Sequence, residues 1–157
     1  MGTVTTKVTW NGELRFTGTS AKGHETVLDG NTQAGPSPVE TLLEALGACA
    51  AIDVVLILEK SRTPAQKLEV TLTGNRHEPE PRYFTDAVMR FDIWGAGIRP
   101  ETLARAINLS VTKYCSVYHS LRADLKVQPA FRLHAPEAEA TGEYHVVEMG
   151  VPTGGLD

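Results

Sequence analysis

Two cysteines, Cys49 and Cys115, are the residues of this sequence best suited to chemistry. Cys49 lies in the apolar run 45–58, where a cysteine often acts only as a small buried hydrophobic side chain. Cys115 follows a lysine and a tyrosine, and these neighbours together with a helix N-terminus would favour a thiolate. Two cysteines on two helices indicate a redox pair if the helices pack with Cα atoms about 6 Å apart. The alternative is a structural domain with two inert thiols.

Two carboxylates lie near Cys49 along the chain. Glu40 stands three residues after Ser37, so it completes a capping box, a purely structural role. The functional alternative is that the Glu40 carboxylate, about two and a half helical turns from Cys49, binds a cationic side chain that stabilises a reactive thiolate. Asp53 follows Cys49 by one turn, where an unpaired carboxylate would raise the thiol pKa and a paired or solvated one would not.

The histidines give no sign of a metal site. Ligand spacings such as CxxC or HxxxH do not occur, so we expect no metal site. The five histidines are scattered at His24, His77, His119, His134 and His145.

Composition limits the class of partner. The chain has 157 residues, a formal net charge of -4 and a pI near 5.7, which argues against nucleic acid or an anionic membrane as a partner. The apolar run 45–58 is interrupted by Asp53 and is too short to span a bilayer, and the N-terminus does not resemble a signal peptide. We therefore expect a cytoplasmic protein, in which two cysteines do not serve as a stabilising disulfide.

Extended segments precede the cysteine helix. The alternating segment 3–10 meets Asn11-Gly12, a strong hairpin signal, and 14–18 is the expected return strand. A third strand is expected over 24–28. A loop then leads to Ser37-Pro38, which predicts the N-cap and first position of a helix reaching about Lys60. This helix is apolar on more than one face, so its own sheet and something else, such as a second subunit, should bury it.

The rest of the chain completes an α+β pattern. Strands are expected over 68–72 and 83–94, paired antiparallel, followed by a helix that opens at Pro100 and a strand over 123–133. Cys115 either ends that second helix or begins a short one over 116–121. Residues 1–134 form one expected domain, and 135–157 a tail that adds one strand or lies loose.

Two motifs, one around each cysteine, stand out in this sequence. The first comprises Gly35-Pro36-Ser37-Pro38-Val39-Glu40, Leu42-Leu43, Ala45-Leu46-Gly47-Ala48-Cys49 and Ala51-Ile52-Asp53-Val54-Val55, and the second is Lys113-Tyr114-Cys115-Ser116-Val117. Together they resemble the OsmC/Ohr family of bacterial hydroperoxide-reducing proteins, and its YhfA-like branch most. The resemblance covers about residues 4–133.

The resemblance implies an OsmC-like fold, with antiparallel sheets packed around a central buried cysteine helix in an intertwined homodimer. It implies a thiol-dependent peroxidase that reduces organic hydroperoxides in oxidative or osmotic stress defence. Cys49 would be the peroxidatic cysteine, Cys115 the resolving one, and Glu40 the third catalytic residue. A dithiol reductant, such as a lipoyl group, would close the cycle without a metal or cofactor.

One departure from the family concerns the cation near the thiolate. Family peroxidases pair an arginine of the N-terminal sheet with a glutamate near the helix start, but segment 27–30 has no arginine, and the cations nearby in sequence are Arg15, Lys22 and His24. Without a cation beside the thiolate, the pKa of Cys49 would stay at about 8.5, and peroxide reduction would be slow. The alternative function is a non-catalytic binding or redox-sensing protein on the same scaffold.

Overall fold

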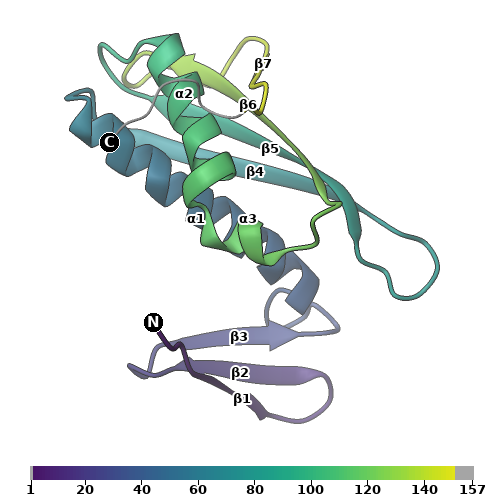
Figure 1. The fold of residues 1–157 in the computed structure, drawn as a ribbon. Helices are drawn as coiled ribbons and strands as arrows, with labels where there is room; N and C mark the ends of the chain where they lie inside the picture. Colours follow the sequence, from purple (N-terminus) through teal and green to yellow (C-terminus); the bar gives the residue numbers. More distant parts are fainter. Residues whose placement is uncertain (1, 151–157) are drawn as a thin grey trace. The chain divides into compact units, whose positions relative to one another are not determined.

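The structure, a computed structural model, describes residues 2–150 in two compact units whose boundary falls between Glu44 and Ala45 (Figure 1). Each unit has a sheet of its own, and one long helix begins in the first unit and continues through the second. In chain order the elements are β1 (Thr6–Trp10), β2 (Arg15–Ser20), β3 (Glu25–Asp29), α1 (Pro38–Lys60), β4 (Lys67–Arg76), β5 (Phe84–Trp94), α2 (Pro100–Leu109), the π-helical turn η1 (Ser110–Tyr114), α3 (Ser116–Ser120), β6 (Lys126–His134) and β7 (His145–Val146).

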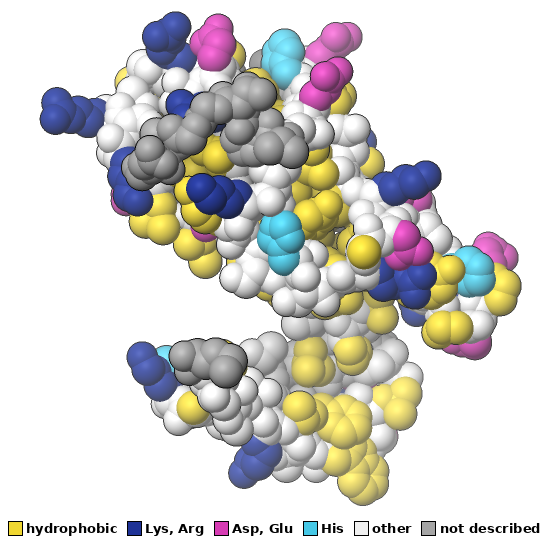
Figure 2. All heavy atoms as spheres, in the orientation of Figure 1, with side chains coloured by type: hydrophobic (Ala, Val, Ile, Leu, Met, Phe, Trp, Pro, Cys, Tyr) yellow, Lys and Arg dark blue, Asp and Glu magenta, His cyan; other side chains and the backbone are white. Residues whose placement is uncertain are grey.

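The first unit contains an antiparallel sheet in the order β1-β2-β3. The expected hairpin at Asn11-Gly12 is present, but its loop is longer than two residues, and the return strand begins at Arg15. Positive φ angles at Gly12 (97°) and Glu13 (49°) turn the chain there. Large apolar side chains remain on the surface of this unit, with Trp10 65% exposed, and Figure 2 shows them gathered together.

The capping box at the start of α1 is present as expected. The Glu40 N–H donates to the Ser37 hydroxyl oxygen at 3.2 Å, and the Ser37 N–H donates to the Glu40 carboxylate at 2.8 Å. These two bonds satisfy backbone donors that a helix start leaves free, so the helix begins at Pro38.

Within the second unit α1 buries one face. Leu46, Ala50, Val54 and Leu58 recur every four residues and are at most 1% exposed, which places them in the core. Gly47 lies against the Leu72 side chain of β4, so the helix backbone approaches the sheet closely.

Another part of the α1 surface is apolar and uncovered. Ile52 is 60% exposed and Leu56 is 47% exposed. By length and composition, the 23 residues of α1, with a mean hydropathy of 2.1 over the most apolar window, would be enough to span a bilayer. The expectation that residues 45–58 are too short to span a bilayer therefore does not apply to the whole of α1. Val54 and Leu58 are nevertheless fully buried, as side chains of a core helix are.

The second unit contains a sheet in the order β4-β5-β6-β7. The α+β fold class is confirmed, as is the antiparallel pairing of β4 with β5. The expectation of wholly antiparallel sheets fails at one pairing, because β5 and β6 run parallel. The physical reason is that α2, η1 and α3 form a crossover connection between these strands, which returns the chain to the same end of the sheet.

A buried carboxylate ties the segment after β6 to this sheet. Asp92 of β5 accepts hydrogen bonds from Arg132 Nε at 2.8 Å and from the Tyr144 hydroxyl at 2.6 Å, and it also contacts His134 Nε2 at 2.8 Å. β7 lies within the expected tail 135–157 and pairs with β6. The rest of that tail, residues 151–157, falls outside the described residues.

Candidate active site

The two cysteines meet in the second unit. Cys49 lies on α1 and is half-buried, whereas Cys115 is fully buried between η1 and α3. Both are free thiols, and Cys49 lies close enough to Cys115 to raise the pKa of the Cys115 thiol. The two cysteines are 66 positions apart in sequence (115 − 49), so their proximity depends on tertiary packing and not on local spacing.

Backbone contacts on both sides hold the Cys115 sulfur in place. The Cys115 N–H donates to the Ser110 carbonyl at 2.7 Å and closes the π-helical turn η1. Cys115 is then the N-cap of α3, and its Sγ accepts a hydrogen bond from the Tyr118 N–H at 3.4 Å. Cys115 therefore both ends the α2–η1 segment and begins a short helix, so the two alternatives that the sequence left open are both met. Single π-helical turns of this kind are often found at functional sites.

The Cys115 thiol is a poor acid in this position. Burial raises the pKa of Cys115 to about 11, and the neighbouring Cys49 and the negative charge of Asp53 act in the same direction. The Tyr118 N–H opposes this shift, since it stabilises the thiolate. Cys115 is therefore a protonated thiol at neutral pH.

Asp53 is paired, and its charge also acts on Cys115. Its Oδ2 accepts a hydrogen bond from the Ser110 hydroxyl at 2.8 Å. The sequence left two alternatives for Asp53, a paired carboxylate or an unpaired one that raises the pKa of a thiol. In the structure Asp53 is paired and still raises the pKa of a thiol, that of Cys115.

Glu40 belongs to the first unit, and the contacts of its carboxylate lie within the capping box. Hydrogen bonds from the Ser37 N–H and then from the Ser37 hydroxyl lower the pKa of Glu40, so it is ionised at neutral pH. The structural role of Glu40 is thus visible, and its catalytic role stays a prediction.

Arg15, one of the three cations considered for the thiolate, is engaged within the first unit. Its Nε lies 3.7 Å from the carboxylate of Asp29, and its Nη2 lies 3.5 Å from Glu13. Asp29 is 1% exposed and accepts backbone hydrogen bonds from the loop after β3, and these bonds lower its pKa. Lys22 and His24 lie at the turn between β2 and β3 in the same unit.

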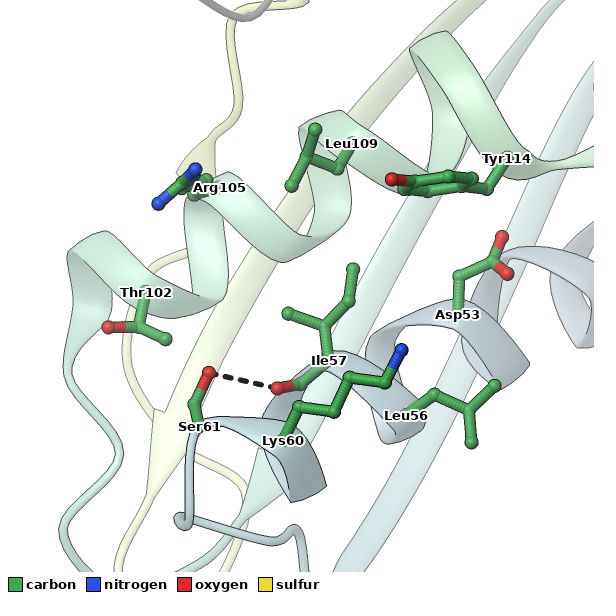
Figure 3. Close-up of a pocket in the computed structure, with 9 residues that line it drawn as sticks. All are labelled: Asp53, Leu56, Ile57, Lys60, Ser61, Thr102, Arg105, Leu109 and Tyr114. Atoms are coloured by element: carbon green, nitrogen blue, oxygen red, sulfur yellow. Dashed lines mark hydrogen bonds between the residues drawn. The ribbon is translucent and has the colours of Figure 1, made fainter. Parts of the chain in front are cut away.

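A cavity of about 760 Å³ opens between the C-terminal half of α1 and the α2–η1 segment (Figure 3). Its walls are mostly apolar, with the cations Lys60 and Arg105 and the carboxylate Asp53 on its surface. The lining residues are Asp53, Leu56, Ile57, Lys60, Ser61, Thr102, Arg105, Leu109 and Tyr114. Neither cysteine belongs to this lining, but Asp53 connects it to the residues around Cys115 through Ser110.

Sequence reasoning did not find this cavity or the role of Ser110. Ser110 is fully buried, although serine is usually exposed. Ser110 follows Leu103 and Ile107 at helical spacing and so falls on the apolar face of the second helix, where a hydroxyl needs a partner. The sequence around Lys60 and Arg105 gave no indication that these two side chains line a cavity.

No group of three or more His, Cys, Asp or Glu side chains able to hold a metal ion occurs within residues 2–150. The site described above consists of two thiols, a carboxylate and a hydroxyl. Such a set can exchange protons and form a disulfide.

Comparison with known proteins agrees with this fold. Protein YhfA of Escherichia coli (strain K12) is 41% identical over 130 residues, which cover 82% of this chain and 97% of YhfA. A structural-genomics structure with 39% identity superposes with a TM-score of 0.77 and covers 83% of this chain and 98% of its own. An organic hydroperoxide resistance protein OsmC from Legionella pneumophila shares the fold at 14% identity, with a TM-score of 0.59 over 87% of this chain and 98% of its own.

The family model for OsmC-like proteins matches residues 29–130, a span that includes both cysteines and the capping box. Together with the extended similarity to YhfA, this match covers most of the two units. The chain belongs to the OsmC-like family.

Proposed function

We propose that this protein is a thiol-dependent peroxidase that reduces organic hydroperoxides with Cys49 and Cys115. The observation that carries the proposal is that a half-buried thiol, Cys49, lies close enough to the fully buried Cys115 to raise its pKa. A peroxidatic cysteine must be reachable by the peroxide, and a resolving cysteine must wait beside it without reacting first. Cys49 fits the first requirement and Cys115 the second.

The reaction balances in three steps. The Cys49 thiol gives up its proton, its thiolate attacks the terminal peroxide oxygen, the O–O bond breaks, and the leaving alkoxide takes up a proton, so the products are an alcohol and a Cys49 sulfenic acid. The Cys115 sulfur then attacks the Cys49 sulfur, and the leaving hydroxyl takes the Cys115 proton and departs as water. A dithiol reductant, such as a lipoyl group, reduces the disulfide and becomes oxidised in turn.

The cavity beside Asp53 supports an organic substrate. Asp53 follows Cys49 by one helical turn, so a molecule in the cavity lies near the cysteine helix. The apolar residues Leu56, Ile57 and Leu109 suit the organic part of a hydroperoxide better than they suit hydrogen peroxide. The name of the Legionella pneumophila relative, an organic hydroperoxide resistance protein, agrees with this choice.

The proposal includes a homodimer in the cytoplasm, acting in stress defence. Ile52 and Leu56 remain exposed on α1, and burial of such apolar surface would stabilise association with a second copy. A reducing compartment suits two cysteines that must return to thiols after each turnover.

A thiol count tests the proposal. Reduced protein mixed with cumene hydroperoxide should lose two thiols per chain, and Cys49→Ser should lose none. Cys115→Ser should stop at the sulfenic acid, which dimedone traps on Cys49. Wild-type protein that keeps both thiols would refute the proposal.

A specific observation favours the non-catalytic alternative of a binding or redox-sensing protein. Arg15, one of the three cations considered for the thiolate, forms ion pairs with Asp29 and Glu13. This alternative predicts that Cys49→Ser binds an organic ligand as tightly as wild type does, and that wild type shows no turnover with a dithiol. Multiple turnovers with dihydrolipoamide would exclude it.

A further inference from the structure

Ser110 joins the turn that carries Cys115 to the helix that carries Cys49. Its buried hydroxyl donates to Asp53 Oδ2 at 2.8 Å and lies 3.1 Å from the Ala50 carbonyl oxygen, both on α1. A hydroxyl has one proton, and the bond to the ionised carboxylate is the shorter and stronger of the two. The Ser110 hydroxyl thus links η1 to α1 by a hydrogen bond inside an apolar core.

The backbone of Ser110 extends this contact to Cys115. The Ser110 carbonyl accepts the Cys115 N–H at 2.7 Å, which closes the π-helical turn. The position of the Cys115 backbone therefore depends on Ser110, while the Tyr118 N–H orients the sulfur from the other side.

The two contacts between the segments are spaced one helical turn apart on α1. Cys49 faces Cys115, and Asp53, four residues later on the same helix face, holds Ser110. Two attachment points restrict rotation of η1 against α1 in a way that one contact would not.

We infer that Asp53 and Ser110 are positioning residues that hold Cys115 against Cys49 for disulfide formation. This inference rests on the proposed function, because it explains how the resolving step is prepared. It concerns the thiol pair itself, so it can be measured without a peroxide.

Loss of the hydrogen bond between Ser110 and Asp53 should lower the effective concentration of the Cys115 thiol at Cys49. Disulfide geometry tolerates only a narrow range of Cα separations, so a loosened η1 spends less time in a productive position. We expect Ser110→Ala to lower the equilibrium constant for the Cys49–Cys115 disulfide about tenfold, which corresponds to about 30 mV for this two-electron couple.

The experiment equilibrates each variant with mixtures of reduced and oxidised glutathione and measures the fraction of the Cys49–Cys115 disulfide by mass spectrometry. Asp53→Ala leaves the Ala50 carbonyl, 3.1 Å from the Ser110 hydroxyl, as a weaker acceptor and should lower the constant between about threefold and tenfold, whereas Asp53→Asn keeps an acceptor oxygen and should change it less than about threefold. Asp53 is half-buried, so Asp53→Ala remains informative if Ser110→Ala does not fold.

Thr112→Val is the matched control. Thr112 lies in the same turn, but its hydroxyl donates to the Asn108 carbonyl within its own helical segment, at 2.6 Å, and does not reach α1. We expect the wild-type constant for this variant. A tenfold loss in Thr112→Val, or constants within twofold of wild type in folded Ser110→Ala and Asp53→Ala, would overturn the inference.

A second measurement separates the inference from the proposed function. With cumene hydroperoxide, Ser110→Ala should form the Cys49 sulfenic acid at the wild-type rate and convert it to the disulfide about tenfold more slowly. If wild type does not react with the peroxide, but the disulfide equilibrium constants measured in glutathione differ between the variants as stated, the peroxidase proposal fails and the positioning role stands. If wild type forms no Cys49–Cys115 disulfide in glutathione, the inference fails.

Discussion

The chemistry of single residues in this protein follows from the different surroundings of two thiols. Cys115 is 0% exposed, and burial raises its pKa to about 11, so it is both inaccessible and protonated at neutral pH. Cys49 is half-buried on α1. The two cysteines lie close together but are not equivalent, and a thiol-specific reagent should distinguish them.

Alkylation of the native protein should therefore label Cys49 well before Cys115. Iodoacetamide reacts with accessible thiolates, and Cys115 offers neither accessibility nor a thiolate. Peptide mass spectrometry at several times gives the two rates, and protein unfolded in urea, where the rates should become similar, is the control. Faster labelling of Cys115 in the native state would contradict the assigned roles.

A second prediction at the residue scale concerns the two roles of Glu40. Glu40→Gln keeps an oxygen that can accept the Ser37 N–H and removes the charge, whereas Glu40→Ala removes both. If the charge of Glu40 serves catalysis, both variants should reduce cumene hydroperoxide at least about tenfold more slowly than wild type. Wild-type rates in Glu40→Gln would limit Glu40 to capping, and thermal unfolding of both variants reports the capping role separately.

Asp92 predicts how stability depends on pH. Burial by itself raises the pKa of Asp92, but hydrogen bonds from Arg132, Tyr144 and His134 outweigh it and lower the pKa from 3.8 to about 2. The folded state thus binds the proton less tightly than the unfolded state does. The resulting stability, on the order of 2 kcal/mol, is present above about pH 4 and is lost as the pH falls toward about 2.

Urea unfolding at several pH values between about 2 and 5 measures this dependence. Asp92→Asn should remove most of it, and Tyr144→Phe, which deletes the hydroxyl donor at 2.6 Å, should weaken it. An unchanged slope in Asp92→Asn would show that other groups cause the acid sensitivity.

At the scale of the elements, α1 is the part that the two units and the site share. It begins at a capping box in the first unit, carries Cys49 and Asp53 in the second, and supplies one wall of the cavity. Its start is fixed by local hydrogen bonds, and its later turns are fixed by packing against β4 and the core. The two ends of the helix should therefore respond differently to mutation.

Ser37→Ala should destabilise the protein by about 1 kcal/mol, because it removes the N-cap oxygen that the Glu40 N–H donates to. Ser61→Ala, at the other end of the same helix, removes only a hydroxyl that bonds the Ile57 carbonyl on the surface and should cost less. Urea unfolding of both variants gives the comparison. Equal losses would show that capping does not determine the stability of the helix start.

For the whole molecule, the exposed apolar surface is the feature that the single chain leaves unexplained. Ile52 and Leu56 on α1 and Trp10 and Val8 on β1 are each at least 47% exposed. A sheet of three strands with such a surface gains little stability by itself. These residues are the reason for proposing a homodimer.

Sedimentation should give a particle of twice the 17.0 kDa chain mass. Ile52→Asp, which places a charge on the exposed part of α1, should shift the particle toward the single chain, and Glu59→Ala on the same helix should not. A wild-type protein that sediments as a single chain at micromolar concentration would refute the dimer.

Much of this protein was predictable because the signals were local. Asn11-Gly12 indicated the hairpin, Ser37-Pro38 and Glu40 indicated the start of α1, and alternating side chains indicated β4 and β5. The paired cysteine motifs indicated the family, which the comparison with OsmC-like proteins confirms. The division into a domain 1–134 and a tail 135–157 stays a prediction.

The amino-acid sequence by itself determined the identity of the two thiols, the order of the elements and the family. Only the tertiary structure decided that Cys115 begins α3 after a π-helical turn, that β6 runs parallel to β5, and that Ser110 holds Asp53. The physical reason is the range of the forces involved. Caps and turns depend on neighbours along the chain, whereas the partner of a buried hydroxyl and the pKa of a buried thiol depend on groups that packing brings in from distant positions.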